Sequence, residues 1–332
     1  MKPNFTSRLL VAALCGCAYA PAFAASTFIV ESRSTGLNYA NYADAGFADS
    51  TGNVYTPGTT GVGSRYSGTG SFFGPTRYAQ YTYTPGTAGY YSIALGWTLS
   101  AGQISTAVNL YTGAATGGGA DIWGNAGGPQ GIIYATTMNM YNNGTPTSGT
   151  PGTGVWKPVT TLQLSSGTTY HLGIYGGYKT PYAGGVTPAD ASANRVISGA
   201  ASFMAATPTI GAYGGPANGA TDIALTGAGN DLSWAAGNYD SSFDVYLDTS
   251  ATPTTKVGSD LSGTTLSFDP DSLGLAGGTT YYWEVVSKNV DVTTPGAIYS
   301  FTTALVPEPS TLALSLLGGL GLAVWNSRRR TA

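Results

Sequence analysis

The feature that most constrains the fold of this chain is an alternation of large apolar and small side chains with a period of two. Within residues 90–99 every second position is large: Tyr91, Ile93, Leu95, Trp97 and Leu99. Successive side chains of a β-strand point to opposite faces, so this spacing predicts a half-buried strand rather than a helix. Residues 170–174 repeat the pattern, with Tyr170, Leu172 and Ile174 expected to face a core.

The composition extends this prediction to the whole chain. Among 332 residues there are 13 basic and 16 acidic ones, against 49 glycines and 23 tyrosines. Lys and Glu, which dominate solvated helices, are scarce, while 42% hydrophobic residues exclude a disordered tail. We therefore expect an all-β protein of two β-sandwich modules, with an N-terminal signal helix and a short C-terminal transmembrane helix.

The N-terminus has the layout of a secretory signal peptide over residues 1–24. Lys2 and Arg8 precede an apolar stretch at 9–18, and Ala22 and Ala24 form the small-residue cleavage pattern. We expect the signal peptidase to cut after Ala24. The chain is therefore predicted to be exported through the inner membrane.

Both cysteines, Cys15 and Cys17, lie inside this signal segment. The sequence Leu14-Cys15-Gly16-Cys17 leaves open a lipoprotein cleavage that would lipidate Cys17. After cleavage at Ala24 the mature chain has no cysteine, which excludes disulfides and thiol chemistry from it.

The C-terminal segment 306–332 has three parts in a fixed order. Pro307, Glu308 and Pro309 precede an apolar stretch at 311–325, and Arg328, Arg329 and Arg330 follow it. Fifteen helical residues reach about 22 Å, against a hydrocarbon core of about 30 Å, so the span is short. The arginines are expected to stay on the cytoplasmic side, with everything upstream outside the inner membrane.

This tail resembles the PEP-CTERM sorting signal of Gram-negative bacteria. The resemblance implies processing by an exosortase, a membrane protease that removes the tail near the tripeptide, and an association with exopolysaccharide. It implies a protein anchored in the inner membrane before processing and located at the cell surface or in the extracellular matrix after it. A plain C-terminal anchor is the alternative.

The mature chain divides at a turn-rich join near 207–216, where the charge balance changes. Residues 25–206 hold six basic and five acidic residues, whereas 207–305 hold two basic and ten acidic. We place one module at 25–206 and the other at 207–304. The acidic balance of the second module argues against nucleic acid as a partner.

Turns about every ten residues in 207–304 are typical of a β-sandwich. The expected strands are 223–234, 242–247, 255–257, 264–268, 280–288 and 297–303. This module resembles a bacterial fibronectin type III domain in three places: Leu232-Ser233-Trp234, the 275–281 segment that ends in Tyr281, and Phe301-Thr302-Thr303. The resemblance implies a tyrosine corner, in which the Tyr281 hydroxyl bonds back to the chain.

The first module repeats the Leu-x-x-Gly-Thr-Thr-Tyr spacing at 164–170, which we interpret as the same device with Tyr170. Its stretch from Phe28 to Trp97 resembles the start of the golvesin or xanthan-lyase carbohydrate-binding-like domain. That resemblance rests on Phe28-Ile29-Val30, Gly63-Ser64-Arg65-Tyr66 and Tyr81-Thr82-Tyr83-Thr84-Pro85 with Ala88-Gly89-Tyr90-Tyr91. It implies a sugar-binding role.

Catalytic groups are few. The one histidine, His171, is expected at a surface or groove, and there is no Gly-x-Ser-x-Gly elbow, zinc ligand set or cofactor motif. A glycosidase needs two carboxylates. The first module offers Glu31, Asp44, Asp49, Asp121 and Asp190, none in an apolar strand-end context.

In the second module Asp244 and Asp248 are expected to point outward on a solvated acidic face, with a calcium site left open.

Trp97, Trp156, Trp234 and Trp283 lie in strand-like segments and are expected in or near the cores. Trp123, Tyr175, Tyr178 and Tyr182 lie beside glycine- and proline-rich turns and are candidates for stacking on a glycan.

We therefore expect a non-enzymatic surface or biofilm-matrix protein that associates with exopolysaccharide, without cofactor or metal. The alternative is a lyase or glycosidase that degrades polysaccharide through the first module.

Overall fold

The computed structural model describes residues 27–54, 62–67, 78–98, 105–118, 127–140, 154–175 and 196–306. In this part the chain is all-β, as predicted, and its helical elements are two three-residue 3-10 turns, Tyr39–Asn41 and Asp271–Leu273. The signal segment 1–24 and the apolar stretch 311–325 lie outside it. Among the described residues, no helix is both long and apolar enough to cross a membrane.

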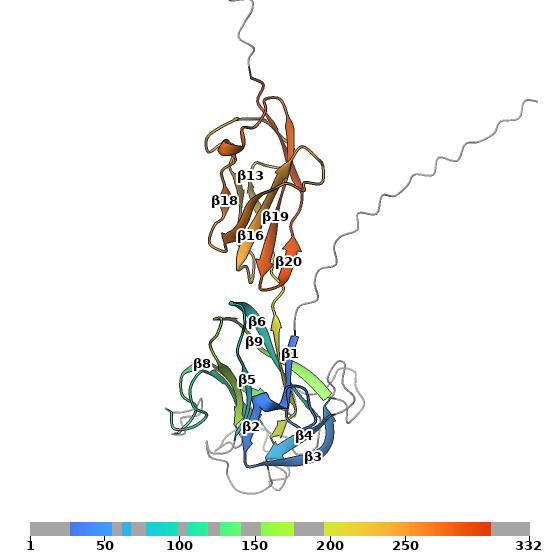
Figure 1. The fold of residues 1–332 in the computed structure, drawn as a ribbon, viewed down its shortest axis with the longest axis vertical. Helices are drawn as coiled ribbons and strands as arrows, with labels where there is room; N and C mark the ends of the chain where they lie inside the picture. The colour runs from blue at the N-terminus through green and yellow to red at the C-terminus, as the bar shows by residue number, and fades with distance from the viewer. Residues whose placement is uncertain are drawn as a thin grey trace, which may run out of the picture.

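The first module is built from two main sheets and a smaller one (Figure 1). One main sheet has the order β1 (Thr27–Glu31), β12 (Ala200–Ala205), β6 (Gly89–Thr98) and β9 (Gly154–Leu164). The other has the order β2 (Tyr42–Ala45), β5 (Tyr78–Tyr83), β10 (Tyr170–Tyr175), β7 (Ser105–Tyr111) and β8 (Ile132–Asn139). The smaller sheet joins β11 (Ile197–Ser198), β4 (Val62–Ser67) and β3 (Phe47–Val54).

The alternating segments form the core of this module. Tyr91, Ile93, Leu95 and Trp97 of β6 are buried, together with Tyr170, Leu172 and Ile174 of β10. Because strand side chains alternate, the remaining residues of β5, β10 and β7 face away from this core. These inward positions are therefore confirmed, while Leu99 lies outside the described residues, and they fix which residues lie on the outer face of the five-stranded sheet.

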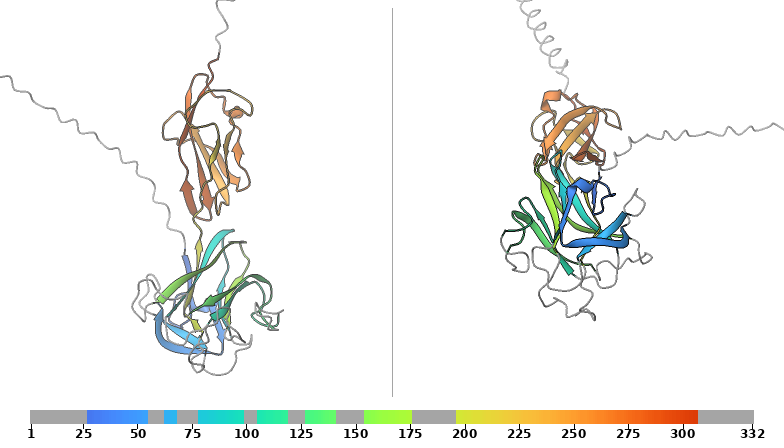
Figure 2. Two further views of the ribbon diagram at one scale, coloured as in Figure 1. Left: turned by 180° about the vertical axis from the view of Figure 1, so that it is seen from behind. Right: turned by 60° about the horizontal axis from the view of Figure 1, so that its bottom comes forward.

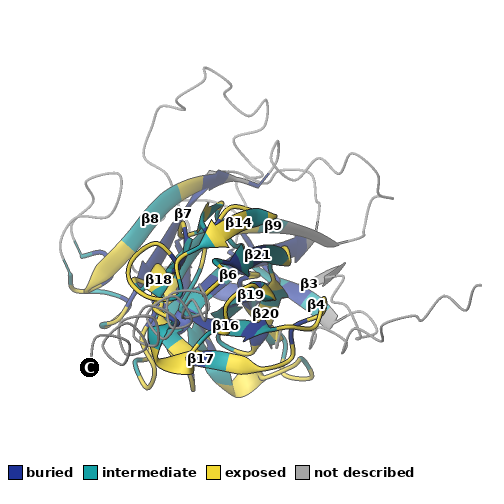
Figure 3. Cartoon of the chain, turned by 90° about the horizontal axis from the view of Figure 1, so that it is seen from above, coloured by how far each residue is buried: buried dark blue, intermediate teal, exposed yellow. Residues whose placement is uncertain are grey.

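The second module also has two sheets. The smaller has the order β13 (Tyr213–Gly215), β15 (Leu232–Trp234) and β18 (Ser267–Phe268). The larger has the order β14 (Ala220–Ile223), β21 (Tyr299–Thr303), β19 (Thr280–Asn289), β16 (Ser242–Asp248) and β17 (Lys256–Ser262), and β20 (Val292–Pro295) pairs with β19. Figure 3 shows exposed residues along the edge strand β17.

The strands expected for this module are corrected at several points. β17 is longer than the expected 255–257, and β13 lies within the expected join at 207–216. Residues 223–234 do not form one strand: β14 ends at Ile223 and β15 begins at Leu232, with Gly227 at a positive φ of 85° in the turn between them. The strand β20 was not predicted, because Pro295 ends it and the segment has no period-two pattern. Trp97, Trp234 and Trp283 are buried as expected, and the side chain of Trp156 lies outside the described residues.

Asp244 does not lie on a solvated acidic face. Its side chain is buried and contacts Lys256 Nζ at 2.6 Å and Lys288 Nζ at 3.3 Å, and its Oδ1 accepts the Asp260 N–H at 2.8 Å. Asp248 instead accepts the backbone N–H groups of Ser250 and Thr254 in a turn. Both basic residues of the module thus contact the Asp244 carboxylate, and Lys288 Nζ also donates to Asp260 Oδ1 at 2.5 Å.

The two modules stack end to end along the longest axis, as Figures 1 and 2 show from opposite sides. The turn between β19 and β20 approaches the start of β6, where the two units touch. The resemblances of the second module to fibronectin type III domains and of the first to golvesin-like domains stay predictions.

Candidate functional site

The outer face of the five-stranded sheet carries a cluster of uncharged polar and aromatic side chains. We call this set the outer-face cluster: Tyr78, Gln80 and Thr82 of β5, Asn109 and Tyr111 of β7, and His171 and Tyr175 of β10. The register brings them together, since His171 pairs with both Thr82 and Tyr111. Their partners on the flanking strands are also uncharged, with Ala43 and Ala45 on β2 and Ile132 and Ala135 on β8.

His171 is half-buried in this cluster and is held by hydrogen bonds. Gln80 Nε2 donates to His171 Nδ1 at 2.8 Å, and Thr82 Oγ1 lies 3.0 Å from the same nitrogen. The Tyr111 hydroxyl donates to Gln80 Oε1 at 2.9 Å, so hydrogen bonds connect Tyr111 through Gln80 to His171. Burial lowers the pKa of His171 below its ordinary 6.5, so the imidazole is neutral at pH 7.

Gly173 lies between the rings of Tyr111 and Tyr175, which occupy the space that a side chain at this position would need. A Cβ at this position would lie 2.8 Å from Tyr111 Cε1 and 2.8 Å from Tyr175 Cε2. The two rings therefore close over the glycine, with their centroids 6.5 Å apart. Gly173 pairs with Gln80 on one side and Asn109 on the other, so these two side chains flank it on the same face of the sheet.

Asn109 is fully buried on this face. Neither its side-chain nitrogen nor its oxygen has a hydrogen-bond partner among the described residues. A buried polar group without a partner costs about 1–3 kcal/mol, so such groups are rare and need an explanation. Asn109 is thus a buried member of the outer-face cluster whose amide has no hydrogen-bond partner among the described residues.

The connection that follows β7 folds over the cluster. Residues 112–118 run beside 127–131, with Gly113 N–H donating to Gln130 O at 2.9 Å and Gly118 N–H to Gly128 O at 2.8 Å. Ala115 packs against Ala107, Tyr111 and Tyr175, and the Tyr175 hydroxyl donates to Ala115 O at 2.9 Å. We call residues 112–118 the covering segment.

The predicted stacking residues have different outcomes. Tyr175 is described, and its expected exposure is corrected: it is buried because the covering segment packs on it and bonds its hydroxyl. Trp123, Tyr178 and Tyr182 lie outside the described residues. The sequence did not single out Gln80, Asn109 and Tyr111 as site residues. Their alternate positions along β5 and β7 place them on the face that His171 shares, but the pairing of these strands with β10 is not visible in the sequence.

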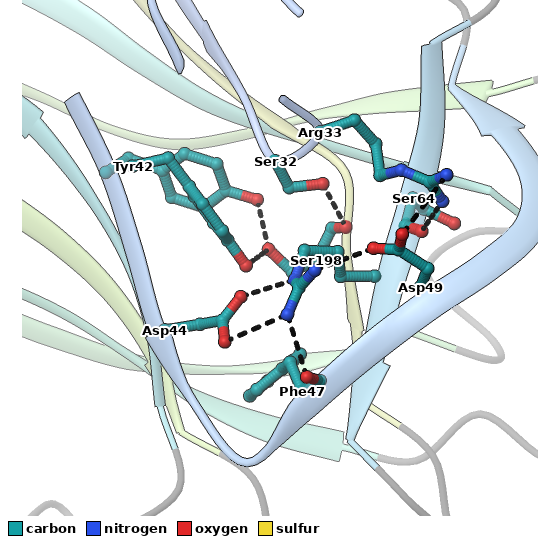
Figure 4. A network of polar contacts seen from close by, with 10 residues as sticks. Ser32, Arg33, Tyr42, Asp44, Phe47, Asp49, Ser64 and Ser198 are labelled. Atoms are coloured by element: carbon teal, nitrogen blue, oxygen red, sulfur yellow. Dashed lines mark hydrogen bonds and ion pairs between the residues drawn. The ribbon is translucent and has the colours of Figure 1, made fainter. Parts of the chain in front are cut away.

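The candidate carboxylates of the first module are bound to other groups (Figure 4). Arg65 donates from Nε to Asp44 Oδ2 at 2.5 Å and from Nη1 to Asp49 Oδ1 at 2.6 Å, and Arg33 Nη2 lies 3.4 Å from Asp49. Glu31 is buried and accepts the Leu37 N–H at 2.7 Å. Asp121 and Asp190 lie outside the described residues.

Further polar contacts lie beside these ion pairs. The hydroxyls of Tyr42 and Tyr81 both bond Ser198 Oγ, at 3.0 and 2.8 Å, and Arg65 also donates to Phe47 O at 2.8 Å (Figure 4). Arg65 of β4 thus links β2 and β3, and Ser198 of β11 links β2 and β5. In the described part of the chain, no group of three or more His, Cys, Asp or Glu residues is placed to hold a metal ion.

Comparison with known proteins identifies the C-terminal tail. Residues 305–330 match the PEP-CTERM protein-sorting motif, in agreement with the resemblance drawn from the sequence. The tripeptide at 307–309, the arginines at 328–330 and the signal peptidase site at Ala22 and Ala24 lie outside the described residues. No curated protein matches the chain significantly.

Three solved structures show distant likeness. A cycloisomaltooligosaccharide glucanotransferase of Paenibacillus sp. is 15% identical with a TM-score of 0.26, over 53% of this chain and 17% of that one. A beta-(1,4)-mannanase of Podospora anserina is 9% identical with a TM-score of 0.28, over 62% and 31%. The cleaved adhesin domain of Lys-gingipain from Porphyromonas gingivalis is 13% identical with a TM-score of 0.27, over 54% and 95%.

The chain thus spans less than a third of the two enzymes it is compared with. Similarity at this level carries no argument about activity. The tail is informative: the PEP-CTERM motif marks the chain as an exported protein sorted by exosortase, anchored in the membrane before cleavage and located at the surface or outside the cell after it.

Proposed function

We propose that this chain is a non-catalytic surface or matrix protein that associates with exopolysaccharide through the outer-face cluster of its first module. The observation that carries the proposal is Asn109, whose buried amide has no partner among the described residues. A sugar hydroxyl both donates and accepts hydrogen bonds and would satisfy either end of that amide. The covering segment packs on Tyr111 and Tyr175, so we expect it to move aside on binding and free their rings to stack on a sugar.

The charge of the cluster favours a neutral glycan. Gln80, Thr82, Tyr111 and neutral His171 offer uncharged donors and acceptors, and the paired positions on β2 and β8 carry no charge. Recognition of a uronate or sulfate would instead call for Arg or Lys close to the ligand. We therefore expect neutral polysaccharide to bind better than anionic polysaccharide.

The ionisation of the cluster supports binding without turnover. Burial raises the pKa of Tyr111 above its ordinary 10, so the phenol stays protonated at pH 7 and its basic form is not populated. A lyase using Tyr111 or a glycosidase using the described carboxylates would need groups that are free to exchange protons. Asp44 and Asp49 are instead occupied by Arg65.

The proposal is tested with the 25–305 chain in native gels containing dextran, galactomannan or alginate, alongside assays for new reducing ends and for unsaturated uronates. Retardation in a neutral polysaccharide, reduced in Gln80→Ala, is expected without turnover. Product formation would instead establish the polysaccharide-degrading alternative. No retardation in any polysaccharide, including that of the producing bacterium, would reject the glycan proposal.

Exosortase processing is tested separately by fractionating cells with and without the exosortase gene. We expect a shorter, released product when the enzyme is present and a longer, membrane-bound one when it is absent. An identical size and location in both strains would contradict the sorting account.

A further inference from the structure

Asn289 of the second module forms hydrogen bonds to the backbone of the first. Its Nδ2 donates to Tyr90 O at 2.8 Å and to Ala206 O at 2.7 Å, and its Oδ1 accepts the Tyr90 N–H at 2.8 Å. Ser241 Oγ donates to the same oxygen at 2.9 Å. The side-chain amide therefore bonds both backbone groups of Tyr90, as a neighbouring strand would, and it is fully buried there.

The turn after Asn289 adds an apolar contact. Asn289 pairs with Val292, so Val290 and Asp291 form a two-residue hairpin turn, and Val290 packs against the core of the first module. Val290 has a φ of 54°, a region that disfavours β-branched residues and that glycine would occupy more easily. The turn thus carries a strained valine at the position that contacts the other module.

A second strained residue lies at the same place. The described residues include five non-glycine positions with positive φ, and three of them, Asn38, Asp222 and Asp260, are of the types that tolerate it. The other two are Val290 and Tyr239, and the ring of Tyr239 lies 5.7 Å from that of Tyr90. Both bulky outliers contact the first module, which links the strain to the junction.

The first module is shaped to receive this turn. A Cβ at Gly89 would lie 2.6 Å from Asn289 Oδ1 and 2.6 Å from Val290 Cγ2. The glycine therefore lets the turn of the second module approach β6. By contrast, a Cβ at Gly86 would meet no atom within 4 Å.

We propose that the start of β6 and the end of β12 form a socket for the Asn289–Asp291 turn, and that this contact fixes the two modules as one rigid unit. Modules joined by a short linker are otherwise expected to move relative to each other. The socket would hold the outer-face cluster in a constant orientation to the C-terminal end. This inference does not depend on glycan binding.

The test measures a distance between the modules in the 25–305 chain. Because that chain has no cysteine, Thr137→Cys on β8 and Ala251→Cys in the β16–β17 turn place two unique spin labels at exposed positions. We expect a narrow distance distribution in the parent chain. Gly89→Ala and Asn289→Ala should each broaden it about twofold or more, as for modules joined only by their linker.

Two matched variants control for loss of stability. Gly86→Ala adds a methyl group in open space, and Asn230→Ala removes a buried amide that bonds Leu225 O and Asp271 within the second module. Neither should broaden the distribution. If Asn289→Ala does not fold, Asn289→Asp, which loses both donors, carries the same expectation. A broad parent distribution, an unchanged width in Gly89→Ala or in the Asn289 variant, or equal broadening in a control would overturn the proposal.

Discussion

Tyr170 in the first module and Tyr281 in the second make the same hydrogen bond. Each hydroxyl accepts the backbone N–H of the residue five positions earlier, Ser165 and Ala276 respectively, at 2.9 Å. In both cases the bond closes the turn that precedes a core strand, β10 or β19. The shared Leu-x-x-Gly-Thr-Thr-Tyr spacing therefore encodes one structural device used twice, as the sequence predicted.

Removing either hydroxyl should lower stability by a similar amount. Tyr170→Phe and Tyr281→Phe each leave one backbone N–H without its acceptor, and we expect each to lower the free energy of unfolding by about 1 kcal/mol. Urea denaturation of the 25–305 chain measures this. Tyr282→Phe is the control, since no hydrogen bond of its hydroxyl is seen within the described residues. A loss as large in the control would contradict the assignment.

The histidine of the outer-face cluster should make the protein acid-sensitive. Burial lowers the pKa of His171 in the folded state below 6.5, so the unfolded chain takes up the proton more readily. Stability should therefore be constant above pH 6.5 and fall below it. Glu284, whose pKa is raised by burial, acts in the opposite direction. The informative quantity is thus the difference between wild type and His171→Gln, in which the loss from pH 6.5 to 5.5 should disappear; equal losses would contradict it.

Asp244 should contribute to the acid response of the second module. Burial acts to raise its pKa, but the Asp260 N–H and the ammonium groups of Lys256 and Lys288 outweigh it and hold the pKa below 3.8. Its contribution is therefore present above pH 3.8 and lost as the pH falls through the lower folded-state value. Asp244→Asn should lower the free energy of unfolding at pH 7 by about 1–2 kcal/mol and flatten this acid loss. The exposed Asp222→Asn should change neither, and an equal effect there would argue against the assignment.

Asn109 should show opposite effects on stability and on binding. Asn109→Leu has a similar size and removes an amide that is unpaired among the described residues, so the free energy of unfolding should rise by about 1 kcal/mol. Glycan retention should fall in the same variant. Urea denaturation and gel retardation on one preparation measure both. A fall in stability with retention unchanged would mean that the Asn109 amide stabilises the fold and does not bind glycan.

The sequence predicted the features of this molecule that depend on interactions between residues close together in the chain. The period-two alternation of β6 and the spacing before Tyr170 and Tyr281 act within one strand or one turn, so the sequence displays them. The burial of Tyr175 depends on Gly173 and on a covering segment sixty residues earlier in the chain. The pairing of Asp244 with Lys288, forty-four residues away, likewise follows from strand order, which no single stretch of sequence contains.

The most direct test of the account is gel retardation of the 25–305 chain in neutral polysaccharide, with turnover assayed in the same samples. The account predicts retardation in at least one neutral polysaccharide, weaker in Gln80→Ala and Asn109→Leu, with no new reducing ends and no unsaturated uronates. Cleavage products, or retardation that both variants leave unchanged, would contradict it.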